Sequence, residues 1–200
     1  MAIDEALLQT TPVSLLRFYR WSEPSVSFGY FGQFDEAQQF AGGRTLIRRW
    51  TGGGIVPHGD DLTYSLIIRA TDPAFQFSSS AIYRAVHEAI AYSLRSIGIQ
   101  TALAQKAAPR ITDSCFANPV VADVIESGRK VAGAAHRRTR AGLLHQGSIQ
   151  RDGLNLRFRN ELSMALSRRT SAGKIGANVI EMAEKLAAGK YATEAWLSRR

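Results

Sequence analysis

Residues 120–151 read VVADVIESGRKVAGAAHRRTRAGLLHQGSIQR, and this stretch is the most informative part of the chain for the fold class. It contains three runs that are rich in aliphatic residues and long enough for strands: Val120–Glu126, Lys130–Arg138 and Leu143–Arg151. Ser127-Gly128 and Thr139–Gly142, which separate the runs, have the composition of tight turns. Short turns join antiparallel neighbours, so the stretch predicts a hairpin-like meander.

The segment before this meander predicts the clearest helix. Within Ser80–Ile97, aliphatic residues repeat every four positions and would share one helix face: Ile82, Val86, Ile90 and Leu94. Serines at positions 78–80 can cap the start of this helix, and Gly98 can terminate it. The pattern predicts one long amphipathic helix.

Further strands precede this helix, and further helices follow the meander. The additional strand predictions are aliphatic and aromatic runs: Val13–Trp21, Val26–Tyr30, Thr45–Arg49 and Thr63–Arg69. The additional helix predictions are Ala2–Leu8, Asn155–Ser167 and Ala177–Leu186. Strands grouped on either side of one long helix favour an α+β fold with a mixed, mostly antiparallel sheet over a doubly wound βαβ sheet.

Length and composition predict a single globular domain in the cytoplasm. The chain has 200 residues, of which 45% are hydrophobic. No apolar run approaches the roughly 20 residues of a bilayer span, so a membrane protein and a disordered chain are excluded. The opening MAIDEALL lacks the basic segment of a secretory signal. Cys115 is the single cysteine, which excludes an internal disulfide, and the absence of a Cys/His cluster predicts no metal site.

The net charge of +8 indicates an electropositive surface that attracts anionic partners. Nucleic acid, acidic proteins and phosphorylated small molecules all satisfy this condition. Because no helix-turn-helix, RNP or zinc-finger pattern is present, nucleic acid is the less favoured partner.

The most unusual stretch is Arg48-Arg49-Trp50-Thr51-Gly52-Gly53-Gly54. Three adjacent glycines are common where main chain must approach a ligand closely, and the loop amides and arginines could hold a phosphate or carboxylate, or line a slot for an acyl chain. A tight, bulged strand connection with solvated arginines explains the same residues equally well. The spacing fits neither the Rossmann nor the P-loop motif.

Two further residues could carry chemistry. Lys130 is followed by small residues that leave room for a substrate, and neighbouring arginines with partial burial would favour its neutral amine. The alternative is an ordinary hairpin lysine in solvent. Cys115 lies in a turn-like stretch of a cationic protein, conditions that stabilise a thiolate, although a lone cysteine is more often a small buried apolar residue.

The four histidines have no metal-ligand spacing. His87 falls on the long helix, where a structural role is expected, and His136 is expected on a strand surface. His58 follows the glycine loop, and His145 lies in a strand beside Gly147, whose lack of a side chain allows a close approach.

Four blocks of the sequence, in this order, resemble the lipoate-protein ligase A and octanoyltransferase family. They are MAIDEALL (1–8), RRWTGGGIVPHGDDLTYS (48–65), GRKVAGAAHRR (128–138) and LLHQGSI (143–149). The resemblance implies a fold like that of biotin-protein ligases and class II aminoacyl-tRNA synthetase cores, with a mixed, mostly antiparallel sheet flanked by helices. Residues 1–200 would then form one catalytic domain, without the family's first strand or a C-terminal accessory domain.

The resemblance implies transfer of an octanoyl or lipoyl group to a lysine of a lipoyl carrier domain in 2-oxoacid dehydrogenase or glycine-cleavage proteins. Within the family, ligases activate lipoate with Mg-ATP, whereas one octanoyltransferase branch takes octanoyl from acyl carrier protein onto a cysteine. The position of Cys115 before Lys130 resembles that branch, and HGDDLTYS lacks the His-Asp-x-Gly-Asn run of the ligases. We therefore expect a transferase that requires no cofactor, rather than a ligase that requires ATP and Mg.

By the same resemblance, Cys115 and Lys130 are the expected catalytic residues. The expected substrate-binding residues are Arg48, Arg49, Gly52, Gly53, Gly54, His58, Gly133, His145 and Gly147. The positive surface fits acidic acyl carrier protein and lipoyl domains as partners, with no membrane. The alternatives are a noncatalytic acyl- or carrier-binding protein and an arginine-rich nucleic-acid binder, for which binding would depend steeply on salt.

Overall fold

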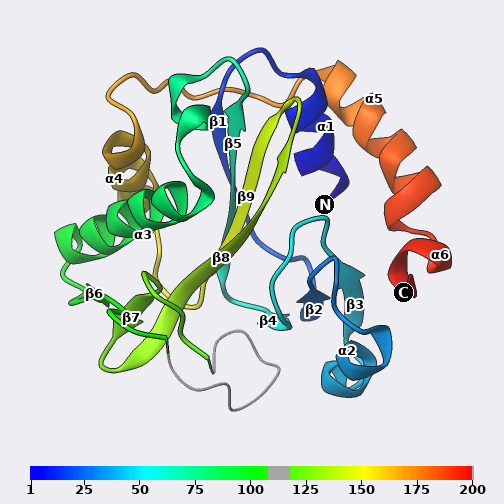
Figure 1. Cartoon of the computed structure of the whole chain (residues 1–200), viewed down its shortest axis with the longest axis horizontal. Coiled ribbons are helices and arrows are strands. Elements are labelled where there is room, and N and C mark those ends of the chain that lie inside the picture. Colours follow the sequence, from blue (N-terminus) through cyan, green and yellow to red (C-terminus); the bar gives the residue numbers. More distant parts are fainter. Residues whose placement is uncertain (108–117, 200) are drawn as a thin grey trace.

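The computed structural model describes residues 1–107 and 118–199 of the chain (Figure 1). Its helices are α1 (Ala2–Thr10), α2 (Phe34–Ala41), α3 (Ser79–Ser96), α4 (Leu156–Leu166), α5 (Ala177–Leu186) and α6 (Glu194–Leu197), with a 3-10 turn η1 (Pro73–Gln76) and a π-helical turn η2 (Ala187–Tyr191). Its strands are β1 (Leu15–Tyr19), β2 (Ser25–Phe28), β3 (Thr45–Arg48), β4 (Val56–His58), β5 (Leu62–Arg69), β6 (Ala102–Leu103), β7 (Val124–Glu126), β8 (Arg129–Thr139) and β9 (Gly142–Ile149).

Within the described residues, the strands form two sheets. The larger sheet has six strands in the order β1-β5-β9-β8-β7-β6, and every neighbouring pair is antiparallel. The smaller sheet has the order β3-β2-β4, with β2 and β3 parallel. The predicted α+β class and the antiparallel meander are therefore confirmed.

Helices cover both faces of the large sheet (Figure 1). On one face, α3 and α4 pack against the strands, and the predicted aliphatic face of α3 is buried there, with Ile90 and Leu94 fully inaccessible. On the other face, α1 and α5 pack on Ile67 and Leu144. Residues 67 and 68 belong to opposite faces, as the two-residue period of a strand requires.

Among the described α-helices and strands, α2, α6, β4 and β6 have no sequence-based prediction. Helix α2 has eight residues, and its apolar face is short, formed by Ala37 and Ala41 with partly buried Phe34 beside them. Strand β4 has three residues, one of which is a proline, and β6 and α6 are also shorter than the length at which periodicity is visible.

The first strand of the meander is shorter than predicted. The chain from Val120 to Asp123 forms a turn rather than a strand, with the Asp123 amide bonded to the Val120 carbonyl and a left-handed conformation at Ala122. Strand β7 therefore begins at Val124.

Neither a membrane-spanning helix nor a cluster of metal-binding side chains occurs in the described part of the chain. No helix there is long and apolar enough to cross a membrane. The same residues contain no group of three or more His, Cys, Asp or Glu side chains that could hold a metal ion.

Candidate active site

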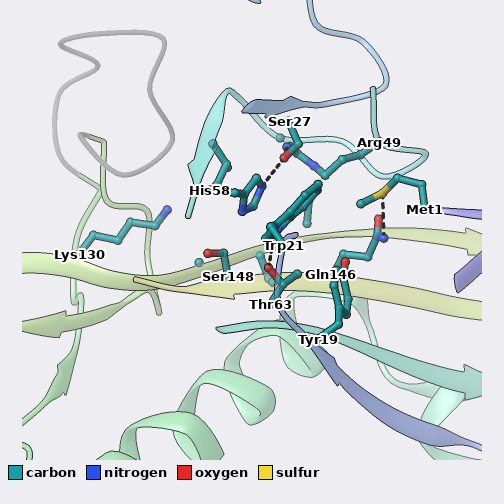
Figure 2. Close-up of a pocket in the computed structure, with 16 residues that line it drawn as sticks. Met1, Tyr19, Trp21, Ser27, Arg49, His58, Thr63, Lys130, Gln146 and Ser148 are labelled. Atoms are coloured by element: carbon teal, nitrogen blue, oxygen red, sulfur yellow. Dashed lines mark hydrogen bonds between the residues drawn. The ribbon is translucent and has the colours of Figure 1, made fainter. Parts of the chain in front are cut away.

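A cavity lies between the two sheets, on the face of the large sheet away from α3 (Figure 2). Its empty volume is about 470 Å³, including a part that opens to solvent, and its accessible wall is mostly apolar. The structure brings together here these residues expected from the sequence: Arg49, Gly53, His58, Lys130, Gly133 and Gly147.

Lys130 extends along the floor of the cavity from β8 (Figure 2). Its Nζ lies 2.8 Å from Oδ2 of Asp123, and the two side chains are 4% and 0% exposed. The expectation of a solvated hairpin lysine is wrong, because this amine is one half of a buried ion pair. The sequence analysis placed arginines beside this amine, and the structure also places a buried carboxylate there.

Gly133 provides the space for this arm. A Cβ at position 133 would lie 2.3 Å from Cε and 2.6 Å from Nζ of Lys130. Gly147 has the corresponding role on the opposite side of the sheet, where a Cβ would lie 2.4 Å from Oη of Tyr64. The small residues after Lys130 therefore make room for protein side chains as well as for the cavity.

A chain of hydrogen bonds runs along the other wall, from Arg49 through Ser27 and His58 to Asp61. Figure 2 shows its first three members. The Arg49 guanidinium can only donate, so Oγ of Ser27 accepts from it at 2.7 Å. The Ser27 hydroxyl then donates to Nε2 of His58 at 2.6 Å, which leaves the proton of the imidazole on Nδ1. Nδ1 in turn donates to Oδ2 of Asp61 at 2.9 Å.

The pKa shifts of His58 and Asp61 agree with the donor and acceptor roles in this series of hydrogen bonds. Burial lowers the pKa of His58 below its usual value, although Asp61 acts in the opposite sense. Burial acts to raise the pKa of Asp61, but the hydrogen bonds from His58, Ser148 and the Gly59 amide outweigh it and leave this pKa below its usual value. The pair is thus a neutral imidazole hydrogen-bonded to an ionised carboxylate.

His58 is also fixed in orientation by an aromatic neighbour. Its ring stacks on Trp21, with centroids 4.1 Å apart, and the indole donates to Oγ1 of Thr63. Thr63 donates to the same Asp61 oxygen as His58 does. Trp21, Ser27 and Asp61 were not predicted as site residues, and for Asp61 the signal was its position three residues after His58.

The two adjacent arginines of the glycine motif have different partners. Arg49 donates to the carbonyls of Gly52 and Gly54, at 3.0 and 2.8 Å, and so holds the glycine loop closed beside the cavity. Gly53 has φ of +88°, a left-handed conformation that favours glycine.

Arg48 points away from the cavity and is 1% exposed. Its guanidinium donates to main-chain carbonyls at 2.7 to 2.9 Å, those of Tyr30, Gly32, Leu197 and Arg199. Among the described residues, Arg48 links strand β3 to the C-terminal segment through these hydrogen bonds. It does not line the cavity.

His145 also lies apart from the cavity. It is fully buried beneath the sheet, where Nε2 contacts Oη of Tyr64 at 3.1 Å and its ring lies near those of His87 and His136. His87 is fully buried as expected, and burial lowers its pKa to about 4. His136 lies on strand β8, half-buried, and is paired with His145 across β8 and β9.

Cys115 lies outside the described residues, so its expected catalytic role remains a prediction. The described residues nonetheless include a titratable group that the sequence analysis missed. Asp123 is seven positions before Lys130, and the sequence signal for it was a single acidic residue within the aliphatic run of residues 120–125.

A family model and several relatives of known name match this chain, and all of them concern lipoyl or octanoyl transfer. A family model described as "Lipoyl protein ligase A/B catalytic domain" matches residues 1–187. Octanoyltransferase LipM of Moorella thermoacetica is 30% identical over 256 aligned positions, covering 100% of this chain and 93% of that protein. Octanoyltransferase LipM of Oceanobacillus iheyensis is 34% identical over 160 residues, covering 74% of this chain and 58% of that protein. With several such relatives, the aligned part spans about 60% of the relative's length.

Solved structures show the same fold. A putative lipoate protein ligase from T. acidophilum, Ta0514 with bound lipoic acid, has a TM-score of 0.77 at 23% identity, covering 98% of this chain and 91% of that one. A lipoate-protein ligase A bound with ATP has a TM-score of 0.76 at 24% identity, covering 98% and 92% of the two chains.

Proposed function

Because the chain belongs to the lipoyl protein ligase A/B catalytic-domain family, we propose that it is an octanoyltransferase that acts in protein lipoylation. It transfers an octanoyl group to the lysine of a lipoyl carrier domain. The observation that carries the proposal is that Lys130, Gly133 and Gly53 of the glycine loop all line one cavity. The chain that contains them aligns over its full length with a relative named octanoyltransferase.

The reaction proceeds in two acyl transfers. In the first, the Cys115 thiolate attacks the thioester of octanoyl-acyl carrier protein, a new C–S bond forms, and the carrier's thiolate leaves and takes up a proton. In the second, the amine of the carrier-domain lysine attacks the Cys115 thioester, an amide forms, and the cysteine thiol is released. The support for Cys115 is its place in the sequence, as the single cysteine of the chain, ahead of the Gly-Arg-Lys segment.

Each transfer passes through a tetrahedral intermediate with negative charge on the former carbonyl oxygen. Lys130 is suited to stabilise that charge, because its ammonium lies in the wall of the cavity. The apolar wall beyond it, which includes Trp21 and Val56, is suited to the octanoyl chain. The net charge of +8 would speed encounters with acidic carrier proteins.

The mechanism is tested by intact-mass measurement of the protein after incubation with octanoyl-acyl carrier protein, and separately with octanoate plus Mg-ATP. We expect an octanoyl adduct with the first donor alone, its loss in Cys115→Ser, and its transfer to a lipoyl domain added afterwards. Lipoyl-domain modification only with octanoate and Mg-ATP would identify an ATP-dependent ligase. Octanoate binding without modification in either case would identify a noncatalytic acyl-binding protein.

A further inference from the structure

The carboxylate that holds Lys130 is itself held in one orientation by the surrounding fold. Asp123 is fully buried, and within the described residues it accepts two hydrogen bonds besides its contact with Lys130. The Val120 amide donates to Oδ2 at 2.7 Å, and Oη of Tyr83 donates to Oδ1 at 2.5 Å. Both oxygens are therefore engaged, one by its own turn and one by helix α3.

The turn that carries Asp123 is anchored to the same helix. Nδ1 of His87 donates to the carbonyl of Ala122 at 2.9 Å, and the ring of His87 lies edge-on against Tyr83 with centroids 4.1 Å apart. Helix α3 thus sets the position of both the backbone and the side chain of Asp123. A carboxylate held in this way cannot turn to follow a mobile lysine, so the lysine must come to it.

Lys130 meets this carboxylate by lying across Gly133. Its Cε occupies the space where any other residue at position 133 would have a side chain. The Lys130 side chain is therefore 4% exposed, is paired with Asp123 and lines the wall of the cavity. A flexible four-carbon side chain is thereby confined to one place before substrate arrives.

From this geometry, and resting on the proposed octanoyl transfer, we propose that Asp123 is the positioning residue of the site. It holds the Lys130 ammonium in place as a hydrogen-bond donor toward the acyl carbonyl, and Tyr83 orients Asp123. The assignment gives Lys130 the part of an oxyanion stabiliser and removes it as the base that deprotonates the acceptor lysine.

The test compares Asp123→Asn with a matched control, Glu126→Gln. Glu126 lies on neighbouring β7, pairs with Arg151 at 3.4 Å, and is partly exposed, so its variant removes an equal charge without touching Lys130. We expect Asp123→Asn to lower kcat for octanoyl transfer by roughly 10²-fold, with KM for the acyl donor little changed. Glu126→Gln should retain both constants, and a thermal melt of each variant reports folding.

A second readout does not depend on the transferase activity. Trinitrobenzenesulfonate reacts with free amines, and peptide mapping gives the rate for Lys130 relative to exposed Lys174 in the same sample. Loss of the carboxylate should raise the relative rate at Lys130 by about tenfold, because the arm is then released to solvent. Equal Lys130 labelling in wild type and folded Asp123→Asn would overturn the positioning role, whether or not the wild type transfers octanoyl.

Tyr83→Phe keeps the test decisive if Asp123→Asn fails to fold. It leaves the carboxylate in place and removes only the hydroxyl that orients it. We expect roughly a tenfold loss of kcat and faster labelling of Lys130 in a folded protein. Wild-type values of both kcat and labelling in this variant would refute the orienting role of Tyr83. If the wild type transfers no octanoyl at all, the proposed function fails while the labelling still reports on Asp123.

Discussion

Replacing Gly133 by alanine isolates the space on which the Lys130 arm depends. The added Cβ would lie 2.3 Å from Cε and 2.6 Å from Nζ of Lys130, and 3.4 Å from Oδ1 of Asp123. Carbon atoms normally approach to about 3.5–4.0 Å, so the arm must move by more than 1 Å. The far end of a lysine is flexible, whereas the strand is not, and we expect the arm rather than β8 to shift.

The magnitude follows from what the shifted arm loses. Breaking a buried ion pair by removing one partner costs roughly 3–5 kcal/mol. Asp123 keeps its bonds from Tyr83 and the Val120 amide, and the displaced ammonium reaches water, so we expect about 2–3 kcal/mol. For a domain of this size that is a fall in Tm of about 4–12 °C. Octanoyl transfer should fall much further, by about 10²-fold, because the donor that we propose to stabilise the developing charge would be misplaced.

The assay pairs a thermal melt with single-turnover transfer from octanoyl-acyl carrier protein to a lipoyl domain. Gly173→Ala is the matched control, because a Cβ there meets no atom within 4 Å and the residue has no positive φ. A Gly133→Ala variant with wild-type melting and wild-type transfer would refute the reasoning. If transfer by Gly133→Ala fell only in proportion to the fraction of the variant that is unfolded, Lys130 would have a structural role and no role in transfer.

Three other perturbations separate structural from functional residues. The unfolding free energy should fall by about 3 kcal/mol between pH 6.5 and pH 4, because burial lowers the pKa of His87 to about 4 and the unfolded chain binds the proton first. In urea melts, the unfolding free energy of His87→Phe should fall less steeply with decreasing pH than that of wild type. Parallel curves for the two proteins would contradict this. Arg48→Ala should lower the unfolding free energy by about 3 kcal/mol and leave KM for the acyl donor unchanged, since its partners are main-chain carbonyls; a raised KM with unchanged melting would restore its expected substrate role. Gly147→Ala should destabilise by about 1–3 kcal/mol through its clash with Tyr64, measured by urea unfolding, and an unchanged midpoint would show that the ring moves freely.

The predicted site residues fall into groups that the sequence could not separate. Arg48 is the last residue of β3 and Arg49 directly follows it, and the side chain of Arg49 lines the cavity whereas that of Arg48 does not. Which of the two meets the cavity depends on where the C-terminal segment packs, and Arg48 bonds to a carbonyl 149 residues away. The glycine motif alone therefore predicted two ligand-binding arginines where the structure places one beside the cavity.

Patterns among residues close together in the sequence were enough to predict the main helices and strands. The four-residue repeat of helix α3 and the turn residues between β8 and β9 act through neighbours a few positions apart, so their pattern is visible in the sequence itself. Short elements such as β4 escaped prediction because three residues carry no period.

The chemistry of the cavity depends instead on contacts between distant residues. Ser148 donates to Asp61 across 87 positions, Tyr83 donates to Asp123 across 40, and Ser27 meets His58 across 31. No local period encodes such pairs, because each forms only when two sheets and a helix pack together. Burial then changes what the side chains can do: it makes His58 a neutral acceptor and pairs Lys130 with a carboxylate, whereas composition alone had suggested a free amine among arginines.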